Sequence, residues 1–379
     1  HAAKSVNPEI KTIPEIYPGI EEEATRVGAD VYSLYPVVDV VAHEYEFGSG
    51  DHMASARTPL DWFRYQVGMH SFRAFAGGKA TWILNYSWDG DKKVDAREAM
   101  QNLAMSQVMA GANFWDAPGH SMAGSNDLAT RTKIFGWLAQ HEATFYRPRA
   151  PIRPVGVYFS PRTRDYGAQD FIASYRGCLI LLMQKHWEFQ VVTPRTLAEF
   201  KGDTLVLPDV REMSAEERVG LKKLATSGKR IVITGQNASG LKASANVALF
   251  PDCPCRKYEG GLDANMENAD PDRAKDFLES LQHKEEIEIA ASPQVATSVA
   301  MVDGKTLVFL ANFSGLRGGV NPLPTTQKGI VVRLGKRSKR VEFLPFLGEV
   351  QEIRAERDEE AFVYRLSDLG RGGVVSIEK

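Results

Sequence analysis

The sequence predicts an α/β protein made of the second half of a (β/α)8 TIM-type barrel, a flavodoxin-like doubly wound domain and a small antiparallel β-sandwich. Three observations support this order. Strand and helix patterns alternate as far as residue 145, a segment rich in proline and arginine at residues 147–154 breaks both patterns, and the alternation typical of antiparallel strands begins near Val295. The expected domains are residues 1–150, 151–250 and 295–379, with a connecting segment of helix and loop at residues 251–294.

Composition narrows the classes of function. The chain has 379 residues, which favours two or three domains rather than one. A formal net charge of -2 gives no electrostatic reason to expect nucleic acid or an anionic membrane as a partner. No apolar run approaches the roughly 20 residues of a membrane span, and the first residues lack the basic and apolar pattern of a signal peptide. We therefore expect a cytoplasmic protein, or an exported one if a signal peptide has been removed.

Four strand patterns precede the proline-rich segment, and each is followed by a helical pattern. Four such βα units make half of an eight-stranded barrel. Residues 1–8 resemble the end of a helix that follows an earlier strand, so we expect an N-terminal half-barrel on the same chain or on another. The expected strands are residues 11–19, 37–42, 80–85 and 112–116, and the expected helices are residues 20–34, 60–76, 96–110 and 132–145.

The later patterns predict two further kinds of sheet. Apolar strands and two long helices alternate between residues 155 and 234, as in a small doubly wound unit. An Asp-Gly pair at residues 303–304 separates two alternating runs and is a strong hairpin signal. The expected doubly wound strands are residues 155–159, 189–192, 204–208 and 230–234, and the expected antiparallel strands are residues 298–302, 306–312, 329–334, 340–344, 361–366 and 373–377.

Polar and aromatic side chains gather where the strands of the half-barrel end. In α/β barrels, side chains at the carboxyl ends of the parallel strands line the site. Glu44 and Glu46 are alternate residues of an extended chain, so they are expected on one face, where one of two close carboxyl groups has a raised pKa and can donate a proton. The catalytic candidates are Glu44, Glu46 and Asp116, and the substrate-binding candidates are Glu15, His43, Asn85, Tyr86, Trp88, Asp89 and Trp115.

Other interpretations of these residues stay open. Glu44 and Glu46 could instead pair with Arg57 or Arg64 as a structural network at the strand end. Trp82 lies inside its strand and is expected in the core. The barrel could also serve only as a binding module, in which tryptophans offer flat faces to sugar rings and carboxylates hold hydroxyl groups.

The sequence supports neither a metal site nor a cofactor site. His43, Glu44, Glu46 and His120 are suitable ligand types, but their spacing matches no metal motif. Three cysteines are too few for a disulfide framework, and a single Cys-x-Cys motif lacks the four ligands of a structural zinc site. We therefore expect no metal and no cofactor.

Four segments carry a resemblance to a known family. They are Asp39-Val40-Val41, Gly78-Lys79 before Trp82-Ile83-Leu84, Ala110-Gly111-Ala112, and Asp203 to Thr234. Together with the domain order, they resemble the β-galactosidases of glycoside hydrolase family 42 over most of the chain. The resemblance implies a clan A barrel, a carbohydrate substrate and a homo-oligomer, a trimer, to which the second domain contributes.

The resemblance also implies where catalytic groups belong. Retaining glycosidases of this class use an acid/base at the end of the fourth barrel strand and a nucleophile at the end of the seventh, about 5 Å apart. If residues 11–19 are the fifth strand, the fourth lies outside this sequence, which is then the C-terminal part of a longer protein. The nucleophile position holds Asn85 or Tyr86, and an amide cannot form the glycosyl ester. We therefore expect a glycoside hydrolase that acts on β-linked, galactoside-type carbohydrate through displaced carboxylates; the alternative is a carbohydrate-binding or catalytically inactive member of the fold.

Overall fold

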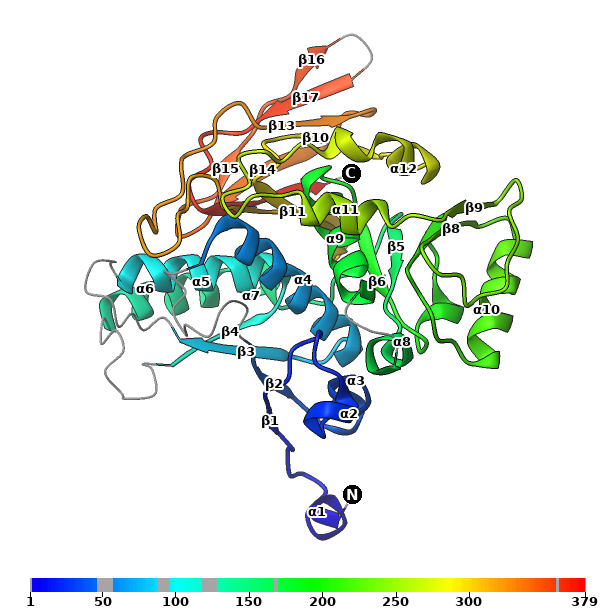
Figure 1. Cartoon of the computed structure of the whole chain (residues 1–379). Helices are drawn as coiled ribbons and strands as arrows, with labels where there is room; N and C mark the ends of the chain where they lie inside the picture. Colours follow the sequence, from blue (N-terminus) through cyan, green and yellow to red (C-terminus); the bar gives the residue numbers. More distant parts are fainter. Residues whose placement is uncertain are drawn as a thin grey trace.

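The computed structural model describes residues 2–45, 57–86, 96–117, 128–166, 170–358 and 361–378. These residues form two parallel and two antiparallel sheets, so the protein is a mixed α/β structure (Figure 1). Both parallel regions and one face of an antiparallel sheet share a continuous hydrophobic core. None of the described helices is both long and apolar enough to cross a membrane.

The first parallel sheet has the strand order β1-β2-β3-β4, which is the order of the chain itself. Helices α4 and α5 pack against it and against each other. Among the described strands, none pairs with the outer edge of β1 or of β4. The strands are β1 (Glu15–Ile16), β2 (Val41–Glu44), β3 (Thr81–Tyr86) and β4 (Asn113–Ala117), and the helices are α1 (Ala2–Val6), α2 (Ala24–Val27), α3 (Val31–Leu34), η1 (Tyr35–Val37), α4 (Pro59–Ala76), α5 (Ala96–Ala110), α6 (Leu128–Gln140) and α7 (Glu142–Phe145).

Local sequence signals set both ends of α4. The backbone N–H of Asp61 donates to the Thr58 hydroxyl, while the Asp61 carboxylate accepts from the Thr58 backbone N–H at 3.0 Å, which makes a capping box. Pro59 follows in the first turn, where its missing N–H costs no helical hydrogen bond. Gly77 ends the helix in the left-handed conformation, with φ 61°. The helix expected at residues 60–76 is thus confirmed to within one residue.

The chain before β2 is less regular than the sequence predicts. The strand expected at residues 11–19 is two residues long in the structure. The helix expected at residues 20–34 is two short helices, because Gly28 (φ 73°) ends the first and the Asp30 side chain caps the second.

Strand β2 also begins later than expected. Within the run at residues 37–42, Val37 belongs to a 3-10 turn and is 67% exposed, and the strand starts only at Val41. Asp39 explains the delay, since its carboxylate accepts a hydrogen bond from the backbone N–H of Thr12 at 2.8 Å and holds the chain outside the ladder. The prediction of a strand buried on both faces over this whole run is therefore wrong.

The second parallel sheet has the order β6-β5-β7-β8-β9. Three of its strands match the expected limits, and β5 ends one residue early. The sequence analysis missed β9, a run of four apolar residues at the edge of the sheet that is only partly buried. The strands are β5 (Val155–Tyr158), β6 (Phe189–Val192), β7 (Thr204–Pro208), β8 (Arg230–Thr234) and β9 (Val247–Phe250), and the helices are α8 (Pro161–Tyr166), α9 (Asp170–Gln184), η3 (Leu197–Glu199), α10 (Ala215–Thr226), α11 (Pro254–Gly260), η4 (Pro271–Ala274) and α12 (Lys275–Ser280).

Two antiparallel sheets complete the described chain, with the orders β10-β13-β17-β16 and β11-β12-β18-β14-β15. The expected Asp-Gly hairpin is confirmed: Val302 pairs with Lys305, and Asp303 and Gly304 both have positive φ, at 46° and 79°. The strands are β10 (Ile287–Ala290), β11 (Val295–Val302), β12 (Lys305–Asn312), β13 (Val331–Leu334), β14 (Arg340–Pro345), β15 (Gln351–Glu352), β16 (Glu356–Asp358), β17 (Ala361–Arg365) and β18 (Gly372–Glu378).

The five-stranded antiparallel sheet is buried on both faces. Along β12, Val308 and Leu310 belong to the core between the two antiparallel sheets, whereas Leu307 and Phe309 belong to the core shared with the parallel regions. Helix α5 packs on β12 and β18, and α9 packs on β11. This sheet therefore joins both parallel regions to the rest of the molecule.

A buried carboxylate also joins the parallel regions. Oε1 of Glu259 on α11 accepts from Nε of Arg64 on α4 at 2.8 Å and from Nε of Arg176 on α9 at 2.5 Å, and the Glu259 side chain is 3% exposed. Because the two guanidinium groups are also largely removed from water, the shared carboxylate stabilises the charge of both.

Glu259→Gln is expected to lower the free energy of unfolding by about 3 kcal/mol, because it leaves two partly buried arginines without their shared carboxylate. Glu279→Gln is the matched control, since Glu279 is 66% exposed and pairs with Lys275 at 3.7 Å, so it should cost about 0.5 kcal/mol or less. Urea unfolding of both variants tests this. Equal, small losses would show that Glu259 does not tie the helices together.

Candidate functional site

The first parallel sheet has two faces of different character. Alternation along β2 directs Val41 and His43 toward the helices, where His43 stacks on Phe72 of α4 with ring centres 4.0 Å apart. The side chains that alternate with these along the strands, and their partners in register, point to the other face, which we call the inner face. Its described members are Glu15, Ala42, Glu44, Trp82, Leu84, Asn113 and Trp115.

One row of the inner face runs across three strands near their carboxyl ends. Glu44 pairs with Leu84, and Leu84 pairs with Trp115, so the Cα atoms of Glu44 and Trp115 lie two strand spacings, roughly 10 Å, apart. Glu15 pairs with Ala42, which places it one step nearer the amino ends. Glu44 and Trp115 are half-buried and Glu15 is exposed.

Trp82 differs from the sequence-based expectation. It was expected in the core, yet its side chain is 37% exposed on the inner face and meets Trp115 edge to face, with ring centres 6.3 Å apart. Its apolar neighbours in the sequence predict burial, but they do not show which face of the strand is covered. Trp82 is therefore a site candidate that the sequence analysis missed.

The Glu44 carboxylate makes no hydrogen bond or ion pair with any other residue that the structure describes. Arg64 pairs with Glu259 instead, and the Arg57 guanidinium lies over the ring of Tyr65, 4.7 Å from its centre. A structural pairing of Glu44 with either arginine is thus ruled out. Glu44 stays available to a ligand.

His43 lies in the core rather than at the inner face. Its side chain is fully buried, and the Tyr35 hydroxyl lies 2.5 Å from Nδ1. Burial lowers the pKa of His43 to about 3, so the ring is neutral at ordinary pH. This position keeps His43 from reaching a ligand on the inner face, and we leave it out of the site.

The remaining candidates are placed only in part. Asn85 pairs with Asp116, and Tyr86 pairs with Ala117, so the backbones of Asn85 and Asp116 are neighbours at the carboxyl ends of β3 and β4. Their side chains lie outside the described part of the chain. The candidates that fall on undescribed residues altogether are Glu46, Trp88, Asp89 and His120.

Glu21, in the loop after β1, is a second carboxylate that the sequence analysis missed. Burial raises the pKa of Glu21, with a smaller opposing effect from Arg176. It lies close to Tyr45 at the end of β2, where burial raises the phenol pKa further with the help of the Glu21 charge. The run Glu21-Glu22-Glu23 hid this residue, because it looks like the solvent-facing side of a helix.

Within the described residues, no three His, Cys, Asp or Glu side chains come together as metal ligands. The three cysteines are buried. The chemistry available at the strand ends is therefore that of carboxyl groups, amides and indole rings.

Comparison with known proteins adds to this geometry. No protein-family model matches the sequence, and no curated protein matches it. Solved structures do match. A catalytic mutant of a GH42 β-galactosidase from G. stearothermophilus is 10% identical, with a TM-score of 0.63 over 100% of this chain and 65% of its own. The β-galactosidase of Bacillus circulans sp. alkalophilus is 10% identical, with a TM-score of 0.62 over 99% of this chain and 64% of its own.

A third match is α-L-fucosidase isoenzyme 2 from Paenibacillus thiaminolyticus, which is 12% identical with a TM-score of 0.60 over 91% of this chain and 69% of its own. At these identities the likeness concerns the fold. The chain has a fold similar to that of family 42 β-galactosidases, as the sequence analysis expected, and spans about two thirds of the length of these proteins.

Acid is expected to destabilise the protein through His43. Because the folded-state pKa of about 3 lies below the ordinary value of 6.5, the unfolded chain takes up the proton first, and the free energy of unfolding falls as the pH drops below 6.5. One such histidine contributes about 1.4 kcal/mol per pH unit. Measured by urea unfolding across this range, the free energy of unfolding should fall less steeply with decreasing pH in His43→Phe than in the unsubstituted protein. Above neutral pH, both proteins should show the same slope. An unchanged slope in the variant would place the acid sensitivity elsewhere.

Proposed function

We propose that this chain is part of a carbohydrate-active protein of the glycoside hydrolase type, which acts on β-linked, galactoside-type carbohydrate. The observation that carries the proposal is the row of Glu44 and Trp115 on the inner face, near the carboxyl ends of parallel strands. The indole ring of Trp115 suits the C–H face of a sugar. The Glu44 carboxylate, which has no partner among the described residues, suits a sugar hydroxyl or a glycosidic oxygen. The glycosidases with a similar fold support this substrate class.

Hydrolysis needs a second carboxyl group. One group donates a proton to the departing glycosidic oxygen, and the other either attacks the anomeric carbon or takes a proton from the attacking water. We assign the partner of Glu44 to Glu46 or Asp116. Asn85, Tyr86, Trp88, Asp89 and Glu15 would then contact the substrate.

We extend the proposal to the domains of the protein. The four-stranded parallel sheet would be the second half of a barrel, completed by an N-terminal half that pairs with the outer edges of β1 and β4. The order β6-β5-β7-β8-β9 follows the flavodoxin-like pattern, and the two antiparallel sheets would be the β-sandwich. We keep the domain limits given above, and we assign a trimer contact to the second domain.

The alternative is a carbohydrate-binding or inactive protein of the same fold. It is favoured by Asn85, which occupies the position where the resemblance places the nucleophile and which lies beside Asp116 in the sheet. An amide there can hold a hydroxyl group but cannot form a covalent intermediate.

Hydrolysis of a panel of aryl β-glycosides by the intact protein tests the proposal. We expect Glu44→Gln to lower kcat by about 10²-fold or more, as for loss of a general acid or base, and Trp115→Ala to act mainly on KM. Glu142→Gln is the control, since Glu142 is exposed on α7 and should leave both constants unchanged. Absence of hydrolysis, together with oligosaccharide binding that Trp115→Ala abolishes, would select the binding alternative; absence of both would refute the proposal.

A further inference from the structure

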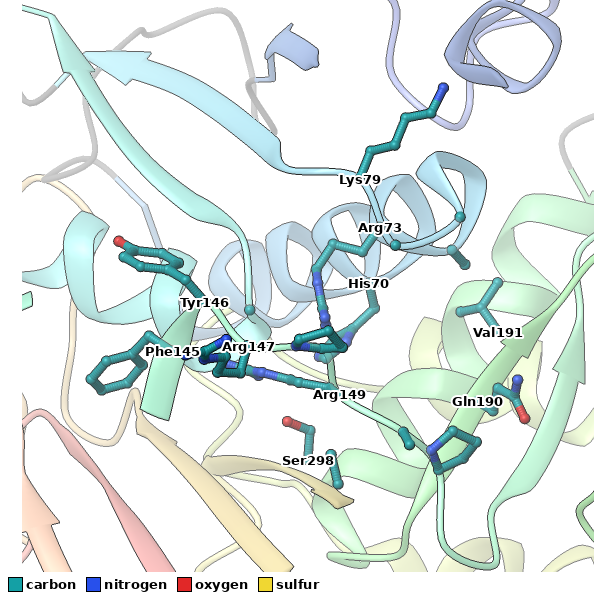
Figure 2. A pocket seen from close by; sticks show the side chains of 18 of the residues that line it. His70, Arg73, Lys79, Phe145, Tyr146, Arg147, Arg149, Gln190, Val191 and Ser298 are labelled. Atoms are coloured by element: carbon teal, nitrogen blue, oxygen red, sulfur yellow. The ribbon is translucent and has the colours of Figure 1, made fainter. Parts of the chain in front are cut away.

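A cavity of about 410 Å³ lies at the amino ends of β3 and β4, at the opposite end of the sheet from Glu44 and Trp115. Helix α4, the segment at residues 145–151, strand β6 and strand β11 form its walls (Figure 2). The cavity therefore sits where both parallel regions meet the antiparallel sheet. Its volume is in the range of small-molecule sites.

The lining of this cavity is basic. His70, Arg73, Arg147 and Arg149 line it, and no Asp or Glu is among its described lining residues. Arg147 is exposed at the rim and pairs with Asp303 at 3.7 Å. Within the described part of the chain, the two inner arginines, Arg73 and Arg149, have no such carboxylate partner.

Arg73 and Arg149 converge on one point. A Cβ atom added at Gly111 would lie 2.6 Å from Cζ of Arg73 and 2.7 Å from Cζ of Arg149. Figure 2 shows the two side chains approaching from α4 and from the segment after α7. Two like charges this close repel each other unless something between them is negative.

Two kinds of partner are described for this pair: the ring of Phe309, whose centre lies 3.5 Å from Cζ of Arg149, and the last carbonyl groups of α5. Arg73 donates to the carbonyl of Ala110 at 2.9 Å, and Arg149 donates to those of Met109 and Val108, both at 2.8 Å. A helix C-terminus carries about half a negative charge, which is less than two guanidinium groups require. Nε of Arg149 is buried without a hydrogen-bond partner among the described atoms.

Two groups at the cavity have lowered pKa values. Burial lowers the pKa of Arg73 to about 10, and the pKa of His70 is lowered by burial and by both arginines. An anion in the cavity would relieve both effects, because it favours the charged forms. The planar fork of a guanidinium group matches the oxygen atoms of a phosphate better than it matches a halide ion.

We propose that this cavity binds a phosphate group, held between Arg73 and Arg149. The apolar side chains of Phe145, Phe189 and Val191 line the remaining volume and leave room for the organic body of a phosphate ester. Because the bound group would connect α4, the end of α5 and the segment before β5, it would strengthen the junction of the three regions.

Thermal unfolding of the full chain tests this site with inorganic phosphate, using sodium chloride of equal ionic strength as reference. Phosphate several-fold above its dissociation constant should raise Tm by roughly 2–4 °C more than chloride does. Glucose 6-phosphate, tested in parallel, should raise Tm by more than inorganic phosphate does if the natural ligand is a phosphate ester. If the natural ligand is the free anion, the two compounds should raise Tm equally. A phosphate effect no larger than that of chloride would refute the proposal.

Two variants locate the effect. Ser298→Asp places a carboxylate on β11 at the cavity wall and keeps both arginines and their helix contacts, so it should remove the phosphate response while the protein remains folded. Arg73→Met should also remove the response, whereas Arg147→Met, which deletes a charge at the rim, should retain it. A phosphate response that persists in both Ser298→Asp and Arg73→Met would show that the anion binds elsewhere.

Discussion

The whole structure depends on an antiparallel sheet that is buried on both faces. Alternate side chains of β12 enter two different cores, so each strand residue contributes to the packing of one region or the other. Burial of a large apolar side chain is worth roughly 1.5–3 kcal/mol, and here both sides of the strand gain it. Loss of this sheet would expose the helices α5 and α9 that pack on it, and with them both parallel regions.

Part of the inner face of the first parallel sheet stays open, since Trp82 is 37% exposed there although Ala42 and Leu84 are buried. Helix α5, which packs on the antiparallel sheet, and helix α4 lie on the opposite face. His43 and Glu44 are neighbours in sequence, yet His43 is a neutral core residue and Glu44 is a half-buried carboxylate with no partner among the described residues. Because side chains alternate between the two faces of a strand, one of two adjacent residues stabilises the core and the other is available for chemistry.

The buried arginines also fall into two groups, those with and those without a carboxylate partner among the described residues. Arg64 and Arg176 share the buried Glu259, which gives each of them a carboxylate partner and links α4, α9 and α11. Among the described residues, Arg73 and Arg149, at the other junction, have helix carbonyls and the ring of Phe309 as partners and no carboxylate. Buried charges need counter-charges in either place, because a low-dielectric environment strengthens attraction and repulsion alike.

The sequence by itself determined the elements and their order. Capping signals at Thr58, apolar runs such as residues 204–208 and the Asp-Gly turn predicted helices, strands and a hairpin that the structure contains, because these signals act over a few residues. The strand-end position of Glu44 was predictable for the same reason. Short elements before β2 and the edge strand β9 were not, since tertiary contacts such as that of Asp39 with Thr12 decide their limits.

Only the tertiary structure decided which candidates can meet a ligand. It placed His43 behind the sheet, exposed Trp82, brought Glu21 beside Tyr45 and left two arginines facing a cavity. None of these outcomes has a local signal, because each depends on which surface of a strand or loop is covered by a segment distant in the chain. Residue type and spacing establish what chemistry is available, and packing establishes which groups water or a ligand can reach.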